Sequence, residues 1–599
     1  MSKELQHTPL GYFKYFYKAM GFKLIFNIFL SVLLGLFDGI GLALFIPLLQ
    51  LVGGNKTASK EESLGGMDFV LKGYDFVGVP LNLFTVLAFI IIIFIIKGIL
   101  NYILSMEQVD LRQKYMVSLR LNQIHLLKNL SYKGFLKLDA GIIQNTLTAE
   151  VGKNLNAMIQ FLNTSKSIVI LSTYLFLAFV SNWQFALLII IGGLLSNLIF
   201  RRVNRLIKES SILISKRANV FSGYIVQSVQ TFKYLKSTAY FDFYTQKIAN
   251  VMKDIESMNR KIGKNQSITA SVREPVLILI ISAVILIQVY WMGATLSSIL
   301  LALLLFYRAL NGLMGVQSSW QSFMQNVGSI EAIHQFNNDL TRNEEKFVNK
   351  DKYSGFSNAI VIENLSFAYG EKSVLKNINI TIPKNKIIAL VGESGSGKST
   401  LANIIVSLLS PATGDIRLDQ NSYSNFDLDS FRKKIGYITQ EPIIYNDTLY
   451  NNITFWAPKT EENIQKFERV IKQVSLWEFL ERLDEKENTP LGDNGLLISG
   501  GQKQRITIAR ELYKDVDIMI LDEATSALDS ETENFIQQSI EDIKGHYTMI
   551  VIAHRLSTIK DADCVYLMDQ GEVIAQGPFN ELIETSPKFN RMVKLQNLQ

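Results

Sequence analysis

Residues 392–400 read Gly392-Glu393-Ser394-Gly395-Ser396-Gly397-Lys398-Ser399-Thr400. They lie between an apolar, strand-like run at 387–391 and a helix-like run at 401–406. A glycine-rich loop in that setting is a P-loop: its backbone N–H groups turn inward on a phosphate, and the following helix adds partial positive charge. Lys398 is expected to reach the β- and γ-phosphates, and the Ser399 hydroxyl to ligate Mg²⁺. The stretch therefore predicts an α/β domain that binds a nucleoside triphosphate.

Two carboxylates end a second strand-like run, Ile518-Met519-Ile520-Leu521-Asp522-Glu523. We expect Asp522 to hold Mg²⁺ through water, and Glu523 to orient or deprotonate the water that attacks the γ-phosphate. Gln440 and His554 each follow a further strand-like run. The carboxyl ends of parallel strands meet at one sheet edge, so all four side chains are expected there. Taken alone, each of these residues has a purely structural alternative.

A second anion site is predicted at Ile498-Ser499-Gly500-Gly501-Gln502. This segment opens a helix, so the first N–H groups of that helix and the Ser499 hydroxyl are available to an anion.

The first 320 residues are far more apolar than the rest, and the mean hydropathy of the whole chain, +0.18, is unusual for a soluble protein. A spanning helix needs about 20 mostly apolar residues. The predicted spans are Leu24–Val52, Leu83–Ile103, Ala157–Val180, Phe185–Ile207, Pro275–Trp291 and Leu296–Leu313. The net charge of +6 is modest and gives no indication of nucleic acid as a partner. A single cysteine, Cys564, excludes an intramolecular disulfide framework.

Lys and Arg are distributed by membrane side. The stretch 201–273 carries fourteen and 107–156 carries seven, whereas the loop 53–80 has three. Because positive charge marks the cytoplasmic side, both termini and the two long loops are predicted to be inside. Their helical spacing predicts cytoplasmic extensions of the spanning helices, turning near Tyr132–Leu138 and Thr231–Tyr234. In the outer loop, residues 67–77 have the pattern of an amphipathic helix, lying either in the headgroup region or on the rim of the protein.

The composition predicts three segments. Residues 1–325 form a six-span helical membrane domain, 326–357 a polar linker, and 358–599 the α/β P-loop domain. The last segment is expected to begin with two strands, at 360–362 and 367–369.

The order of the motifs carries a family resemblance. GESGSGKST at 392–400, ITQ at 438–440, ISGGQ at 498–502, IMILDE at 518–523, SALD at 526–529 and AHR at 553–555 resemble an ABC transporter nucleotide-binding domain. With six spans before it, the chain is similar to a half-size bacterial ABC exporter over essentially its whole length. The resemblance implies ATP hydrolysis with Mg²⁺ coupled to transport, and an inner-membrane location with the motor in the cytoplasm.

The resemblance also implies individual roles. Tyr369 would stack on adenine, Gln440 would sense Mg²⁺ and the membrane domain, and His554 would contact the γ-phosphate. Ser499 and Gly501 would clamp ATP bound to the opposite protomer, and Asp529 would link the two sites. The predicted ATP-binding set is Tyr369, Gly392, Ser394, Gly395, Gly397, Lys398, Ser399, Thr400, Ser499, Gly501, Gln502 and Asp529, with Ser399, Gln440 and Asp522 at the metal.

One motor and one membrane half imply a second copy. Both the P-loop side and the ISGGQ side are intact, so two identical chains would form two competent sites. A homodimer is the simplest interpretation, and a partner subunit with degenerate motifs is the alternative.

Ionisable residues within membrane spans are costly and therefore suggest function. They are Asp38, Lys97, Arg273 and Arg308. The alternatives are that Lys97 snorkels to the interface and that Arg273 anchors it. If the three cations face one cavity, they suit a phosphate-bearing headgroup.

The first span and these cations resemble those of bacterial lipid-linked oligosaccharide flippases: Asp38 before Pro47, Lys97 with Asn101, and an arginine after a tyrosine in the sixth span. An arginine expected one to two turns beyond Arg308 is absent, and Gly315 lies about there. The resemblance implies an ATP-driven flippase of a lipid-linked glycan or related glycolipid. The alternatives are a multidrug or lipid A exporter and, from another class, an ATP-gated channel or regulator.

Overall fold

The computed structural model describes residues 7–45, 48, 82–181, 183–292, 296–345, 351–522, 541, 544–552 and 559–597. The chain divides into two compact units. The helical unit comprises Met1–Leu130 and Gly134–Glu344, and the α/β unit comprises Ser131–Lys133 and Glu345–Gln599.

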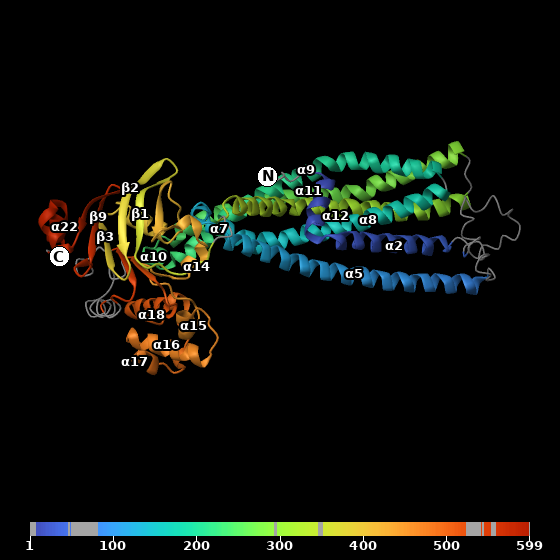
Figure 1. The fold of residues 1–599 in the computed structure, drawn as a ribbon. Coiled ribbons are helices and arrows are strands. Elements are labelled where there is room, and N and C mark those ends of the chain that lie inside the picture. Colours follow the sequence, from blue (N-terminus) through green and yellow to red (C-terminus); the bar gives the residue numbers. More distant parts are fainter. Residues whose placement is uncertain are drawn as a thin grey trace. The chain divides into compact units, whose positions relative to one another are not determined.

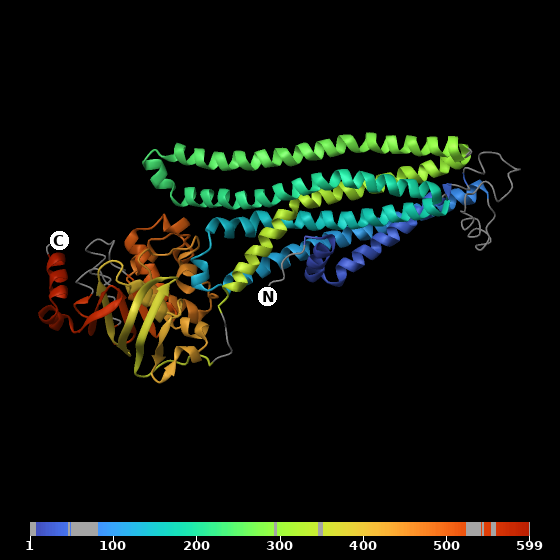
Figure 2. The same cartoon turned by 90° about the horizontal axis from the view of Figure 1, so that it is seen from above.

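Long helices that lie side by side make up the helical unit (Figures 1 and 2). They are α1 (Pro9–Met20), α2 (Phe22–Ala43), α5 (Leu83–Lys128), α6 (Tyr132–Phe135), α7 (Ala140–Asn145), the π-helical turn η1 (Thr146–Glu150), α8 (Val151–Ser181), α9 (Trp183–Gln230), α10 (Phe232–Ser237), α11 (Phe241–Met292) and α12 (Leu296–Arg342), with α6 shared between the units.

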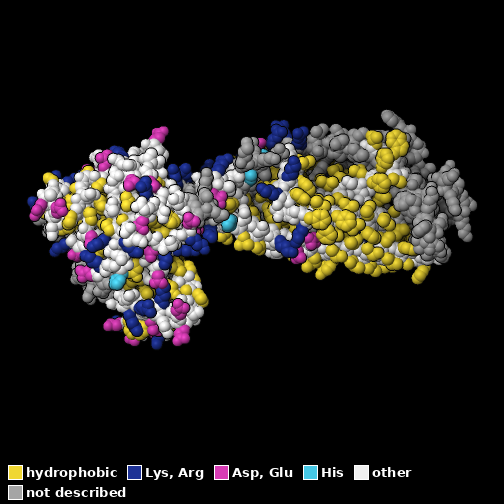
Figure 3. Space-filling model, viewed as in Figure 1, with side chains coloured by type: hydrophobic (Ala, Val, Ile, Leu, Met, Phe, Trp, Pro, Cys, Tyr) yellow, Lys and Arg dark blue, Asp and Glu magenta, His cyan; other side chains and the backbone are white. Residues whose placement is uncertain are grey.

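The predicted spans lie on α2, α5, α8, α9, α11 and α12. Among the described residues, three helices are long and apolar enough to cross a membrane, at Phe22–Ala43, Leu83–Lys128 and Ala140–Val180. Figure 3 shows hydrophobic side chains covering much of this unit, with Lys and Arg gathered along one edge of the apolar surface. The end of the first predicted span and the amphipathic stretch 67–77 lie outside the described residues.

Two helical hairpins extend beyond the predicted spans, and their cytoplasmic location stays a prediction. Helix α5 continues to Lys128 before the chain turns through α6 and α7, and α9 continues to Gln230 before it turns through α10. Both turns fall where the sequence placed them.

The linker predicted at 326–357 is helical over its first half, because α12 runs on to Arg342. Buried side chains at Val327, Ile330, Ile333, Phe336 and Leu340 recur every three or four residues, so one face of this segment packs inside the helical unit. The boundary between the compact units lies at Glu344 and Glu345.

Two sheets form the α/β unit. An antiparallel sheet has the order β2-β1-β4-β5, and a six-stranded sheet has the order β10-β9-β3-β8-β7-β6. In the second sheet only β10 is antiparallel to its neighbour. The strands are β1 (Ala359–Tyr369), β2 (Lys372–Pro383), β3 (Ile387–Gly392), β4 (Thr413–Leu418), β5 (Asn421–Ser422), β6 (Ile435–Ile438), β7 (Ile518–Asp522), β8 (Thr548–Ile552), β9 (Cys564–Asp569) and β10 (Glu572–Gly577).

Helices cover both faces of the six-stranded sheet and form a separate cluster below it in Figure 1. They are α13 (Lys398–Ile405), α14 (Leu428–Arg432), α15 (Leu449–Thr454), α16 (Glu461–Gln473), α17 (Trp477–Glu481), α18 (Gly500–Tyr513), α21 (Phe579–Thr585) and α22 (Pro587–Asn597). Strand β3 is buried along its whole length, as a parallel strand covered on both faces must be.

The two strands predicted at 360–362 and 367–369 are one strand, β1. Its pairing with β2 shifts register between Ile362 and Leu365, where Asn364 has a φ of +48°. Because the strand is irregular here, the sequence pattern resembles two short strands with a break between them.

Candidate nucleotide site and membrane charge cluster

The phosphate cradle joins the end of β3 to the start of α13, as the sequence predicted. Gly392 has a φ of +150°, and a Cβ there would lie 2.1 Å from the Met568 carbonyl oxygen. Gly397 caps α13 with a φ of +104°, and a Cβ there would lie 2.6 Å from Leu375 Cδ2. Glycine is therefore required at both positions by backbone conformation and by space.

Two polar side chains are buried in this loop. Lys398 Nζ donates to the carbonyl oxygens of Gly392 and Glu393 at 2.8 and 3.0 Å, so the lysine side chain folds back along the loop. The Ser396 hydroxyl is buried and has no hydrogen-bond partner among the described residues. The first turn of α13 adds N–H groups that have no partner within the helix. Donors of this kind fit the oxygens of a phosphate chain.

The parallel register brings the other predicted groups to the same sheet edge. Strands β3, β8, β7 and β6 are adjacent, Asp522 is level with Ile552 of β8, and Gln440 follows the end of β6 by two residues. Tyr437 donates its hydroxyl to Asp522 Oδ2 at 3.1 Å. Burial, followed by the Asp522 charge, raises the pKa of Tyr437 well above its usual range, so this donor keeps its proton.

The donor set at this edge fits Mg²⁺. Ser399, Gln440 and Asp522 offer a hydroxyl, an amide oxygen and a carboxylate, which are the hard oxygen ligands that this ion prefers. Lys398 supplies the positive charge that a nucleotide phosphate requires.

Ser499 caps α18. Its Oγ accepts from the Gln502 backbone N–H at 3.3 Å, and Gln502 Oε1 accepts from the Ser499 N–H at 2.9 Å. This reciprocal capping fixes the helix start and leaves Gly500 and Gly501 at its first two positions.

Arg510 is a residue that the sequence reasoning missed. It is buried and donates to the carbonyl oxygens of Asn452 and Ile443 at 2.6 and 2.8 Å. Ile443 lies three residues after Gln440, so Arg510 anchors the segment that carries this glutamine. Its guanidinium also lies over the Tyr445 ring, 5.2 Å from the centroid.

Tyr369 ends β1 and is partly exposed, with its ring edge-on to Phe367 at 4.9 Å. Glu523, Asp529 and His554 lie outside the described residues, and their roles stay predictions.

A second group of charged residues lies in the helical unit. Asp38 on α2 accepts from Lys97 Nζ on α5 through Oδ1 and from the Tyr174 hydroxyl on α8 through Oδ2. Arg308 on α12 lies within electrostatic range of Tyr174, and no hydrogen bond or ion pair joins the two among the described contacts. Two of the four predicted cavity residues, Asp38 and Lys97, are thus in direct contact, and a third, Arg308, lies near them on α12.

The fourth, Arg273, is placed differently. It is buried, and its guanidinium lies 5.9 Å from the centroid of the Phe200 ring. Its Nε has no acceptor among the described residues. Arg273 therefore packs between α11 and α9, and no described contact joins it to the Asp38 group.

Lys166 was missed although it lies inside the third predicted span. Its Nζ donates to Asn101 Oδ1 at 3.2 Å, one helical turn from Lys97 on the same face of α5. We call Asp38, Lys97, Lys166, Tyr174 and Arg308 the membrane charge cluster.

Gly315 faces α8. A Cβ at this position would lie 3.0 Å from Ser167 Oγ, so a side chain there would require Ser167 to shift by a few tenths of an ångström.

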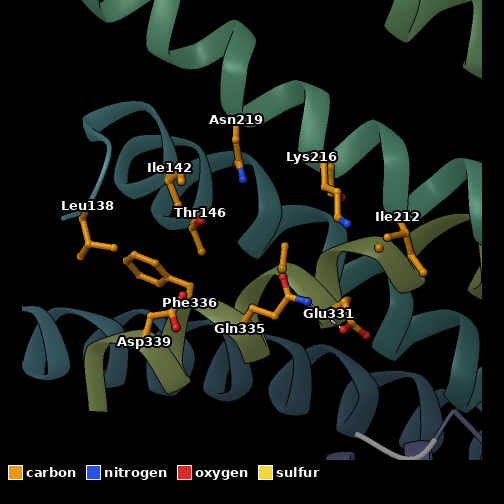
Figure 4. A pocket seen from close by; sticks show the side chains of 13 residues that line it. Leu138, Ile142, Thr146, Ile212, Lys216, Asn219, Glu331, Gln335, Phe336 and Asp339 are labelled. Carbon is orange, nitrogen blue, oxygen red and sulfur yellow. Dashed lines mark hydrogen bonds between the residues drawn. The ribbon is translucent and has the colours of Figure 1, made fainter. Parts of the chain in front are cut away.

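A cavity of about 120 Å³ lies within the helical unit, between α7 and η1, α9 and α12 (Figure 4). Lys216 and Asn219 of α9 and Glu331 and Asp339 of α12 are among the residues that line it. Beside it, the buried Glu150 accepts from Lys153 Nζ and Ser215 Oγ, both at 2.9 Å. Glu150 thus ties the start of α8 to α9 through a satisfied charge.

Comparisons with known proteins agree with this geometry. The ABC transporter family model matches residues 375–526. The chain is 31% identical over 476 residues to an ATP-dependent lipid A-core flippase of Cupriavidus pinatubonensis, covering 76% of this chain and 78% of the relative. It is 30% identical over 471 residues to the heterocyst differentiation ATP-binding protein HepA of a Nostoc species, covering 78% and 76%. A solved bacterial Atm1-family ABC exporter with ATP bound matches the fold with a TM-score of 0.79 at 21% identity, covering 96% of this chain and 98% of that one.

Fold and site together define a multi-pass membrane protein with an ATP-hydrolysing motor. The chain belongs to the ABC transporter family, and within it to the ATP-driven exporters. It is a half-transporter, with one membrane domain fused to one nucleotide-binding domain.

Proposed function

We propose that this exporter flips a lipid-linked oligosaccharide, or a related glycolipid with a phosphate-bearing headgroup, across the bacterial inner membrane. The membrane charge cluster is the observation that carries the proposal. It contains three cations, Lys97, Lys166 and Arg308, and one carboxylate, Asp38. Charges inside a membrane domain face the bundle interior or a water-filled path, because lipid cannot solvate them. A cluster with surplus positive charge suits a phosphate or pyrophosphate group.

The relatives support a lipid as cargo, since several of them are named lipid A-core flippases. A lipid A-type lipid is accordingly the second candidate. Both candidates are large amphiphiles with phosphorylated headgroups, and they differ in the lipid anchor and the sugar.

For the motor, we propose that Ser399, Gln440 and Asp522 hold Mg²⁺ on the ATP phosphates. Glu523 then orients or deprotonates the attacking water. The Tyr437 hydroxyl bond to Asp522 keeps that carboxylate oriented toward the sheet edge.

We further propose that the working unit is a homodimer, in which Ser499 of one copy closes over Lys398 of the other. Exposed aromatic side chains at the end of the α9–α11 hairpin support a contact with a second chain. Phe232, Tyr234 and Phe243 are 55%, 67% and 69% exposed, although aromatic residues are normally covered.

The test uses the purified full-length protein in liposomes. A polyprenyl-pyrophosphate glycan should stimulate ATP hydrolysis and be flipped, and Arg308→Ala should lower both. Asp254→Asn is the matched control, because this exposed carboxylate pairs with Arg217 at 3.7 Å outside the cluster. Unchanged stimulation and flipping in Arg308→Ala would contradict the headgroup hypothesis. If lipid A is flipped and the polyprenyl lipid is not, the second candidate replaces the first.

A further inference from the structure

The membrane charge cluster contains one negative group, and its placement is specific. Both carboxylate oxygens of Asp38 are engaged, Oδ1 by Lys97 and Oδ2 by Tyr174. The Asp38 side chain is 14% exposed and that of Lys97 is 28% exposed, so the ion pair is shielded but not sealed. Lys97 is therefore partly accessible within a single chain.

Close helix packing sets this geometry. Gly35 and Gly39 are one turn apart on α2 and face α8, where a Cβ on Gly39 would lie 2.9 Å from Thr173 Cγ2 and from Leu177 Cδ1. Small residues at this spacing let helix backbones approach closely in membranes. The approach of α2 to α8 brings Asp38 within reach of Tyr174.

The remaining cations of the cluster have no carboxylate partner among the described residues. Lys166 donates to an amide oxygen, and Arg308 is exposed. Uncompensated charge is costly in a membrane, and Asp38 lowers that cost by neutralising Lys97. A doubly charged phosphate offers more charge and more acceptor oxygens than one carboxylate.

We propose that Asp38 is a displaceable counter-ion, which occupies Lys97 until a phosphate of the lipid headgroup takes its place. The displaced carboxylate keeps its hydrogen bond from Tyr174, so it does not become an unpaired group. An uncharged lipid or drug has nothing to exchange with Asp38 and leaves the ion pair closed. Asp38 is thus a specificity residue that favours anionic headgroups over neutral amphiphiles. The inference rests on the proposed function for its substrate class.

Two variants of the full-length protein in liposomes change the exchange in opposite directions. Asp38→Asn keeps an oxygen for Tyr174 and removes the charge, so Lys97 is open to phosphate from the start. The concentration of polyprenyl pyrophosphate that half-stimulates ATP hydrolysis should fall about five-fold. This ratio corresponds to the interaction energy at the upper end of the range for partly exposed ion pairs. Tyr174→Phe removes the second partner of the displaced carboxylate, so this concentration should rise.

The controls separate charge exchange from loosening of the helix packing. The response to uncharged polyprenol should be the same in all variants, and Asp254→Asn should match the wild type. In a Lys97→Gln background, adding Asp38→Asn should not lower the half-stimulating concentration of polyprenyl pyrophosphate any further. The proposal is overturned if Asp38→Asn leaves the anionic response unchanged, or if anionic and neutral responses shift together.

The lipid series also separates this proposal from the proposed function. If the five-fold shift appears with lipid A and not with polyprenyl pyrophosphate, the counter-ion exchange stands and the lipid-linked glycan is wrong. If polyprenyl pyrophosphate stimulates the wild type and Asp38→Asn equally, the cargo stands and the exchange is wrong. A wild-type protein that neither anionic lipid stimulates overturns both.

Discussion

The crossing of α9 and α12 gives a sharp test of the helical unit. A Cβ on Gly328 would lie 2.3 Å from the Ser211 carbonyl oxygen, whereas real Cβ contacts are essentially never below 3.0 Å. The Ser211 hydroxyl bridges the same crossing, because it accepts from the Gly328 N–H at 2.9 Å and donates to the Gln325 carbonyl at 2.6 Å. Gly328→Ala must therefore move two backbones apart by about 0.7 Å.

The magnitude follows from three effects. Overpacking of this kind costs about 1–3 kcal/mol, and loss of the bridging hydrogen bond costs about 1 kcal/mol more. Alanine in place of glycine inside a helix returns about 1 kcal/mol. The net loss is about 1–3 kcal/mol of unfolding free energy for the helical unit. At about 2 °C per kcal/mol for a large domain, the melting temperature should fall by about 2–6 °C.

The assay follows the loss of the monodisperse full-length protein after heating in detergent. Gly263→Ala on α11 is the matched control, because nothing lies within 4 Å of a Cβ there, and it should be neutral or stabilising. If both variants are as stable as the wild type or more so, α9 and α12 do not cross at Ser211 and Gly328.

Three further predictions concern the α/β unit. Glu523→Gln should bind ATP normally and lose hydrolysis, measured with a fluorescent nucleotide and a phosphate-release assay; sustained turnover would reject its role. Arg510→Lys should destabilise the unit by about 2–3 kcal/mol, because a lysine cannot span the two carbonyls that Arg510 binds, and a wild-type melting temperature would argue against that anchor. Asp447 accepts from the Asn451 side chain at 2.8 Å, the Trp456 indole at 2.7 Å and the Thr448 N–H at 2.7 Å, and these bonds lower its pKa, with Asn451 contributing most. A lowered folded pKa means that the stabilisation is present above the unfolded value of about 3.9 and is lost as the pH falls through the folded value. The unfolding free energy of Asp447→Asn should therefore fall less steeply than that of the wild type below about pH 4. An unchanged pH dependence in this range would contradict the stabilising role of the Asp447 carboxylate.

The nucleotide site was largely predictable because its parts are local. The cradle is nine consecutive residues, and the strands that carry Gln440 and Asp522 end where their apolar runs end. Parallel pairing then brings these ends together without any further information. Arg510 and the Tyr437 bond to Asp522 were not predictable, because each joins residues 58 to 85 positions apart.

The linker predicted at 326–357 was wrong over its first half, where α12 continues to Arg342. From Gln325 onward the helix carries polar and charged residues on one face, and that composition is also typical of a linker. The apolar positions Val327, Ile330 and Ile333 were in the sequence at helical spacing, but only burial shows that they pack within a unit. Here the helical period of the apolar positions is the more reliable signal, because polar composition is shared by linkers and by exposed helix faces.

The membrane charge cluster shows what individual sequence positions cannot reveal, namely which charged residues contact each other. The sequence marked Asp38 and Lys97 as costly residues in their spans, and treated the cations as one set that could face a cavity. The structure pairs Lys97 with Asp38, adds Lys166 and Tyr174, and sets Arg273 apart on Phe200. A carboxylate already pairs with the cation that was expected to meet the substrate. Under the proposed function, binding of an anionic headgroup would therefore be an exchange of partners. The proposal therefore predicts that the charge on Asp38, rather than the number of cations, decides which lipids compete for Lys97.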